Sequence, residues 1–515
     1  MCKHDWENMN EMDFEEMLTQ SLPESLPEDV AGGVTPWKKA MNQVLWGIGL
    51  TTAKLNFLGL NYLFPAVGML LILLGFRSLR RENKAFWNCF LISVVRTAYL
   101  MAYCVLDTTI YSSVFANSLL GHYLVLGMCL LQLVQMFYFW RGLLRVQKKA
   151  QMEPSAPGAV GLLAWYAIAV VLAYLEYKGI VIAWAMVIGF FVVIRSLCKL
   201  SKALNQAGYA VQPMKIRVSD QGVCAILAGI LAIGCACGYM FGSSYKMDWK
   251  AREEMTTQQV SQIKASLAEL GFPEYALNDL ISEDILRCQG AVQVISQVND
   301  FPIRQGHSVV RTMVDEHTGK TVKVKTWEYD ARELQLTDIA VQLSGGEKWL
   351  IIHHFLWTVD PGFYGTECIQ LWPGYARTGM GWYSAGEPSG RVLYDKNGQS
   401  YAAAYHDFGA KTFTSNLIFG GEQTSTDIFA TFSMPKNGEN YRGYVAYPMV
   451  QVGQTTGVAD CWINYVHQDG WFQYPALTAM EHRMQSAASR AGVFAVVQNA
   501  LQFWIRDGIV QKISS

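Results

Sequence analysis

Long apolar runs without ionisable groups, or nearly without them, dominate the first half of the chain. Six such runs follow one another, at 58–76, 87–106, 119–140, 158–175, 179–194 and 222–241. A helix needs about 20 apolar residues to cross the hydrocarbon core of a bilayer, and most of these runs reach or approach that length. A buried helix of a soluble core could account for one isolated run but not for six in succession. The pattern predicts a transmembrane helical bundle over 35–242.

A shorter apolar stretch precedes the first long run. Thr35 and Pro36 suit the start of a helix, and apolar residues continue from there at helical spacing. Lys38 and Lys39 favour a cytoplasmic start, which would make 37–57 a seventh crossing. Polar side chains within the stretch favour a re-entrant or interfacial helix instead. The sequence therefore leaves six or seven spans open.

The second half of the chain has the pattern of a water-soluble domain. Residues 243–290 predict a short helical neck with helices at 251–270, 274–280 and 282–287. From 291 to 515 the period shifts toward two, and many short strands predict a β-rich domain of sandwich or jelly-roll type. Within it, Asn397-Gly398 predicts a hairpin turn.

Three further segments of this domain are assigned by their local pattern. We expect a strand at 471–474 and a helix at 476–488, after Pro475. Residues 493–504 fit either a helix or a strand.

Composition agrees with a membrane protein. Of the 515 residues, 51% are hydrophobic and only 16% are charged, whereas soluble domains average about 25% charged residues. A net charge of −1 gives no reason to expect a nucleic-acid partner, which would need a basic patch. The remaining segment, 1–34, is an acidic tail that we expect to be disordered, and it has no apolar core of a signal peptide.

The positions of the basic residues predict the topology. Basic residues cluster after the first, third and fifth runs, at Arg77, Arg80, Arg81, Lys84, Arg141, Arg145, Lys148, Lys149, Arg195, Lys199, Lys202, Lys215 and Arg217. The alternate connections are nearly bare, since 107–118 has no Lys or Arg and 176–178 has only Lys178. Cytoplasmic loops carry the excess of Lys and Arg. We therefore expect a multi-pass plasma-membrane protein with a cytoplasmic N-terminus and an extracytoplasmic domain after residue 241.

Inside the predicted bundle, Arg96 lies near the centre of its run. A charge at that depth is costly and usually faces a bundle interior or a water-filled cavity. Gln132 and Gln135 lie at similar depth on the next run and could hydrogen-bond to it. These three residues could line a substrate or ion path, or they could form an interhelical polar clamp.

Aromatic residues are the candidates for ligand binding in the outer domain. Trp357, Tyr364, Trp372 and Tyr375 lie in Gly- and Pro-punctuated segments, so we expect them on loops that could bind a ligand. The alternative is that these rings belong to the sheet core.

The sequence predicts no metal site or cofactor. His353 and His354 are adjacent in a predicted strand, so they should point to opposite faces and cannot share a metal. No catalytic motif was found, so an enzymatic activity is not favoured. Cys288, Cys368 and Cys461 are the cysteines of the outer domain and allow at most one disulfide.

Three stretches resemble uncharacterised multi-pass membrane proteins of anaerobic Gram-positive bacteria. They are the segment 34–83, LGFPEYALNDLISEDI at 270–285 and YRGYVAYPM at 441–449. The resemblance implies an extracellular outer domain and supplies no catalytic residue.

Together these observations favour a membrane protein whose outer domain binds a ligand or an envelope partner, as a sensor or envelope-associated module. The alternative is a transporter or transport accessory protein with a polar path near Arg96. The expected partners are the lipid bilayer and an extracytoplasmic ligand or protein, without nucleic acid.

Overall fold

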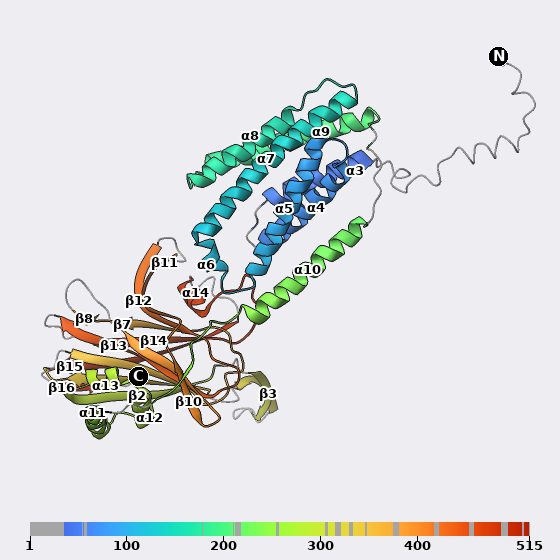
Figure 1. Ribbon diagram of the computed structural model, residues 1–515. Coiled ribbons are helices and arrows are strands. Elements are labelled where there is room, and N and C mark those ends of the chain that lie inside the picture. The colour runs from blue at the N-terminus through green and yellow to red at the C-terminus, as the bar shows by residue number, and fades with distance from the viewer. Residues whose placement is uncertain are drawn as a thin grey trace, which may run out of the picture. The chain divides into compact units, whose positions relative to one another are not determined.

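The protein folds into two compact units in the computed structural model (Figure 1). The helical unit comprises Met1–Leu106 and Ser113–Cys235, and the sheet unit comprises Asp107–Ser112 and Ala236–Ser515. The structure describes residues 36–53, 55, 59–177, 179–209, 211, 218–253, 257–303, 307–314, 321–328, 333–345, 348–373, 381–416, 422–452, 458–485, 493–506 and 509–513. The predicted acidic tail, 1–34, lies outside these residues.

Among the described residues, six helices are long and apolar enough to cross a membrane, and each contains or overlaps one of the six predicted runs. They are α4 (Leu60–Leu79), α5 (Lys84–Leu106), α7 (Leu119–Lys149), α8 (Pro157–Tyr174), α9 (Ile180–Gln206) and α10 (Asp220–Phe241). The short helix α6 (Ser112–Ala116) follows α5, and α3 (Pro36–Thr52) precedes α4. The prediction of an N-terminal helical bundle of membrane-spanning length is confirmed.

Helix α3 corresponds to the stretch for which the sequence left open whether it is a seventh membrane crossing. Its 17 residues are shorter than the six candidate spans. It packs closely against α4, because a Cβ placed at Gly47 would lie 2.6 Å from the carbonyl oxygen of Gly68. The α3 side chains of Trp37, Met41 and Val44 are fully buried in the core of the bundle.

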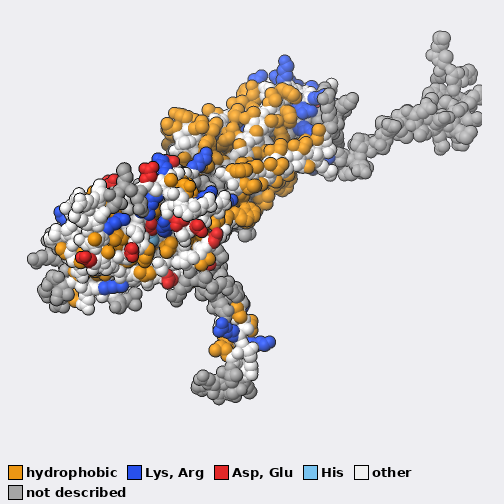
Figure 2. Space-filling view, turned by 60° about the horizontal axis from the view of Figure 1, so that its bottom comes forward, with side chains coloured by type: hydrophobic (Ala, Val, Ile, Leu, Met, Phe, Trp, Pro, Cys, Tyr) orange, Lys and Arg blue, Asp and Glu red, His pale blue; other side chains and the backbone are white. Residues whose placement is uncertain are grey.

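The basic connections of the bundle meet at one end. Arg77 at the end of α4 pairs with Asp220 at the start of α10, with 2.8 Å between Nη1 and Oδ1. Lys149 at the end of α7 donates to the carbonyl oxygen of Glu82 at 2.8 Å, and Tyr209, after α9, donates to the Glu82 carboxylate. Figure 2 shows Lys and Arg side chains gathered at one end of the helical unit, with hydrophobic side chains covering its flanks.

Two antiparallel sheets form the centre of the sheet unit. The larger sheet has the strand order β1-β10-β9-β13-β6-β5-β2, with β8 also paired to β13, and the smaller sheet has the order β11-β12-β7-β14-β15-β16. β3 and β4 form a separate ribbon. The strands are β1 (Lys250–Ala251), β2 (Ala291–Phe301), β3 (His307–Val314), β4 (Thr321–Glu328), β5 (Leu334–Leu343), β6 (Lys348–Trp357), β7 (Glu367–Pro373), β8 (Gly381–Ser384), β9 (Ser389–Lys396), β10 (Gln399–Ala403), β11 (Asp407–Asn416), β12 (Glu422–Phe432), β13 (Glu439–Val452), β14 (Ala459–Gln468), β15 (Phe494–Arg506) and β16 (Ile509–Lys512).

Side chains alternate between two cores along the strands of the larger sheet, as the period of two requires. On β6, Ile351 and Phe355 enter a core to which both sheets contribute, for example through Leu371 of β7 and Tyr465 of β14. Ile352 faces the other way, into a core formed with the helices. The prediction of a C-terminal antiparallel sheet-rich domain is confirmed.

The helices predicted as a neck instead form a layer on the larger sheet. They are α11 (Gln258–Glu269), α12 (Glu274–Asp279) and α13 (Ser282–Arg287), and they belong to the same compact unit as the strands. Val260, Leu277 and Ile285 from these helices share a core with Ile352 and Tyr444 of the sheet. The apolar face of each short helix is therefore buried against strands rather than within a separate stalk.

The structure decides the remaining local predictions. The turn at Asn397-Gly398 is present, with φ angles of 53° and 76° that suit Asn and Gly. All but the first residue of the ambiguous segment 493–504 lie in β15, and the helix expected at 476–488 is the shorter α14 (Ala479–Met484). The strand expected at 471–474 is wrong, because these residues form an irregular loop.

Candidate functional site

Two neighbouring cavities in the sheet unit share the side chains of Arg252 and Arg391. The larger has a volume of about 610 Å³ and the smaller about 230 Å³. The walls come from the chain around β1, the connection between α12 and α13, and strands β9 and β10. Lys246, Asp248, Lys250 and Glu253 are exposed at the larger cavity.

Pairing of β1 with the sheet edge positions Arg252. β1 lies antiparallel to β10, with Lys250 opposite Ala402, and the Arg252 amide donates to the Ser400 carbonyl oxygen at 2.9 Å. On β9, Gly390 precedes Arg391, and a Cβ at Gly390 would collide with the Tyr444 carbonyl oxygen of β13. Glycine therefore allows the close strand approach that places Arg391 in the cavity wall.

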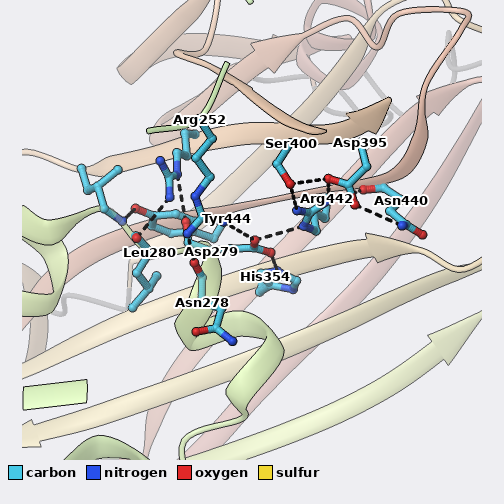
Figure 3. Close-up of polar contacts among 12 residues, drawn as sticks. Arg252, Asn278, Asp279, Leu280, His354, Asp395, Ser400, Asn440, Arg442 and Tyr444 are labelled. Carbon is cyan, nitrogen blue, oxygen red and sulfur yellow. Dashed lines mark hydrogen bonds and ion pairs between the residues drawn. The ribbon is translucent and has the colours of Figure 1, made fainter. Parts of the chain in front are cut away.

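A buried carboxylate lies beside the cavities and organises the cationic side chains. Asp279, only 3% exposed at the end of α12, accepts from His354 Nε2 at 2.9 Å and from Arg442 Nε at 3.0 Å. Arg252 Nη1 lies 3.7 Å from the same carboxylate. Figure 3 shows His354, Arg442 and Arg252 reaching Asp279 from different elements. Burial would raise the pKa of Asp279, but the hydrogen bond from His354 and the charge of Arg442 outweigh it and lower the pKa.

A second carboxylate extends the cluster. Arg442 Nη1 lies 3.0 Å from Asp395 Oδ1, and Ser400 Oγ donates to the same oxygen at 2.6 Å. Burial alone would lower the pKa of Arg442, but the neighbouring Asp279 and Asp395 carboxylates raise it above its usual value. Arg442 is therefore neutralised on both sides, within the cluster drawn in Figure 3.

Arg391 differs from Arg442 because, within the described part of the chain, its hydrogen bonds go to main-chain oxygens and not to carboxylates. Its Nε donates to the Asp279 carbonyl oxygen at 2.9 Å and its Nη2 donates to the Leu280 carbonyl oxygen at 3.2 Å. Among the described residues, no carboxylate lies within ion-pair distance of its guanidinium group. Burial lowers the pKa of Arg391, and the charges of Arg252 and Arg442 add to this effect, while Tyr444 and the Asp279 carboxylate oppose it. A half-buried cation without a carboxylate partner therefore lines both cavities.

The chemistry of this arrangement suits an anion. A guanidinium group presents several donors in one plane and binds carboxylate or phosphate oxygens well. The main-chain carbonyl bonds fix the Arg391 side chain in place, so little of its freedom would be lost on binding. In the described part of the chain, no group of three His, Cys, Asp or Glu residues could hold a metal ion.

The intramembrane candidates are partly brought together. Arg96 of α5 donates to Gln135 Oε1 of α7 at 2.5 Å, and Gln135 Nε2 in turn donates to Ser93 Oγ at 2.7 Å and to the Cys89 carbonyl oxygen at 3.2 Å. Gln132 is also buried, but its Oε1 has no hydrogen-bond partner among the described atoms. The contacts join two helices, as a clamp would, while the proposed path near Arg96 stays a prediction.

The four aromatic candidates do not have a common environment. Trp357 is not on a loop as expected: it lies in β6, is 3% exposed and donates from Nε1 to Tyr465 Oη at 2.9 Å. Trp372 lies in β7, where the Arg483 guanidinium is 5.5 Å from its ring centroid. The prediction that both residues lie on loops is therefore wrong, because both belong to paired strands of the sheets.

Tyr364 does lie between strands β6 and β7, as the loop prediction requires. Its hydroxyl donates to Asp360 Oδ2 at 2.8 Å, and its ring packs on Tyr441 with 5.8 Å between centroids. Tyr375 lies outside the described residues. No contact tests whether any of these aromatic residues binds a ligand, so that role stays a prediction.

The cysteines and histidines of the outer domain can also be placed. Cys288, Cys368 and Cys461 are buried free thiols, and burial raises the pKa of Cys288 to about 12. His353 and His354 point to opposite faces of β6, as predicted, because His353 contacts Asp338 and His354 contacts Asp279.

No pattern in the sequence indicates the Arg391 site. Its members come from distant segments, since Asp279 and Arg442 alone are 163 residues apart, and no member stands out in its own segment. No family model matches this chain, and no curated protein matches it. Functional inference therefore depends on the geometry of the chain itself.

Proposed function

We propose that this protein is a multi-pass membrane protein whose sheet domain lies outside the cytoplasm and binds an anionic ligand at Arg391. The helical bundle anchors the domain. The sheet domain is of sandwich type in this proposal, which the core shared by the two sheets supports.

The sidedness is supported by the charge of the bundle's connections. Basic residues lie at the ends of α4, α7 and α9, and contacts of Arg77, Lys149 and Tyr209 bring these helix ends together. Positively charged connections are retained in the cytoplasm. Helix α10 begins at that end, through the Arg77–Asp220 pair. Its 22 residues extend about 33 Å at 1.5 Å per residue, enough to cross the hydrocarbon core. The chain after Phe241 then emerges on the opposite side.

Ligand binding is supported above all by Arg391. Its guanidinium group has no carboxylate within ion-pair distance among the described residues, lines two cavities and is held by two main-chain oxygens. Arg442, on the adjacent strand β13, has two carboxylate partners. The contrast singles out Arg391 as the side chain whose charge an external anion would neutralise, and the anionic group could be a carboxylate or a phosphate.

The test uses the full chain in lipid nanodiscs with inorganic phosphate as the probe. We expect phosphate to stabilise the protein against heat more than chloride does at equal ionic strength, since a ligand that binds only the folded state stabilises it. In Arg391→Met the phosphate affinity should fall by about 10- to 100-fold, as expected for losing a charge-assisted hydrogen bond of about 1.5–3 kcal/mol.

Lys396→Met is the matched control, because Lys396 is an exposed cation on the same strand as Arg391. This variant should keep the phosphate response of the unmodified protein. Equal responses in Arg391→Met and in the unmodified protein would contradict the proposal, as would the absence of any phosphate effect.

A further inference from the structure

The loop 469–475, between β14 and α14, carries three exposed aromatic side chains. Trp471 is 57% exposed, Phe472 is 71% exposed and Tyr474 is 36% exposed. Trp471 and Phe472 pack on each other, with 5.3 Å between ring centroids. Such large rings are more often buried in soluble domains, so their exposure side by side needs a partner.

Contacts within the sheet unit fix this loop beside the end of α10. The Tyr239 ring packs edge-on against Trp471, with centroids 5.6 Å apart and ring planes at 81°. The Tyr239 hydroxyl donates to the Gln473 carbonyl oxygen at 2.7 Å. Tyr239 is two residues before Phe241, where the candidate span α10 ends.

A second contact ties the loop region to the exit of another candidate span. The Ala476 amide donates to the Asp107 carbonyl oxygen at 2.7 Å, and Asp107 directly follows α5. The two exits are also joined to each other, because the Ile110 amide donates to the Gly242 carbonyl oxygen at 2.9 Å. The loop region is therefore bonded to Asp107, where the chain leaves α5, and to Tyr239, near the end of α10.

The exposed rings adjoin further apolar surface at the end of α10. Met240 is 70% exposed and Phe241 is 79% exposed. Trp and Tyr are the residues enriched where a membrane meets water, since their rings are apolar and their N–H or O–H groups are polar. The bilayer that surrounds the end of α10 is thus within reach of the loop.

We propose that the loop 469–475 enters the lipid headgroup region beside the end of α10, with Trp471 and Phe472 as the inserted side chains. The loop then holds the sheet domain against the membrane surface. This proposal is independent of the anion site, and it holds on whichever side of the membrane the domain lies. The partner is lipid rather than a second protein, because the patch is continuous with the end of a membrane span.

The test places a photo-crosslinking residue on the loop of the full chain. The variant Phe472→p-benzoyl-phenylalanine replaces one exposed aromatic ring by another, so the fold is retained. The protein is reconstituted in nanodiscs of phosphatidylcholine and phosphatidylglycerol, irradiated, and analysed by mass spectrometry for lipid adducts.

The matched control is Val292→p-benzoyl-phenylalanine. Val292 is 53% exposed on β2, an edge strand of the larger sheet that lies away from the end of α10 in Figure 1. We expect several-fold more lipid adduct at position 472 than at position 292. Equal yields at the two positions would overturn the proposal, and so would crosslinks from position 472 to a second copy of the protein in place of lipid.

Discussion

Two adjacent histidines on β6 have separate roles because neighbouring strand residues face opposite ways. His353 Nδ1 lies 2.6 Å from Asp338 Oδ1, and Asn499 of the smaller sheet donates to Asp338 Oδ2 at 2.7 Å. His354 instead joins the Asp279 cluster under the helices. The alternation could be predicted from the sequence. The partners could not, because Asp279 is 75 residues from His354.

A third buried histidine, His467, is expected to make the stability of the sheet domain depend on pH. His467 Nδ1 of β14 lies 2.7 Å from Glu367 Oε1 of β7, and both side chains are at most 1% exposed. Burial alone would lower the pKa of His467, but the Glu367 carboxylate outweighs burial and raises the pKa above its usual value.

We therefore expect His467 to stabilise the sheet domain most under acidic conditions. A group with a raised native pKa contributes its full stability below the unfolded pKa of about 6.5, and the contribution is lost as pH rises through the native pKa. The difference in thermal stability between the unmodified protein and His467→Gln should shrink over that range. A difference that stays constant or grows with pH would exclude the ionised pair.

At the scale of elements, the sequence predicted most accurately what depends on local pattern. The six candidate spans follow from apolar runs, and the turn at Asn397-Gly398 follows from the backbone that these residues allow. The sequence was less informative where tertiary pairing decides. Residues 493–504 fit a helix or a strand by pattern, and pairing of β15 with β14 makes them a strand. Likewise, strand pairing buries Trp357, which its Gly- and Pro-rich neighbourhood placed on a loop.

The packing of α3 on α4 gives a test at this scale. A Cβ at Gly47 would lie 2.6 Å from the Gly68 carbonyl oxygen and 2.9 Å from the Ile72 amide nitrogen, so backbone atoms would have to move. We expect Gly47→Ala to destabilise the bundle by about 1–3 kcal/mol, the usual cost of overpacking. The measurement is thermal unfolding of the purified chain in detergent.

Gly49 provides the control from the same helix. A Cβ at Gly49 meets no heavy atom within 4 Å, so Gly49→Ala should leave stability unchanged or raise it by up to about 1 kcal/mol through helix propensity. If both variants behaved alike, α3 would not be packed on α4 through this contact.

At the scale of the whole molecule, the sequence predicted the two-part organisation but not the site. Apolar runs followed by short alternating segments are local signals, and they are sufficient for a helical bundle followed by a sheet domain. The cavity around Arg391 requires the chain around β1, the α12–α13 connection, β9 and β10 to meet, and only the tertiary structure brings them together. The sequence likewise does not show that the exposed loop at Trp471 lies beside the end of α10, which follows from the contact of Trp471 with Tyr239.

The central claim of this account is that the sheet domain lies outside the cytoplasm and the basic connections lie inside. One epitope tag is inserted in the exposed turn between Asn397 and Gly398, and in a second variant the tag follows Glu153, an exposed residue between α7 and α8. Antibody binding is measured on intact spheroplasts and again after permeabilisation. We expect the tag at Asn397 to be bound on intact spheroplasts and the tag at Glu153 only after permeabilisation. The reverse pattern, or equal access to both tags on intact spheroplasts, would contradict the account.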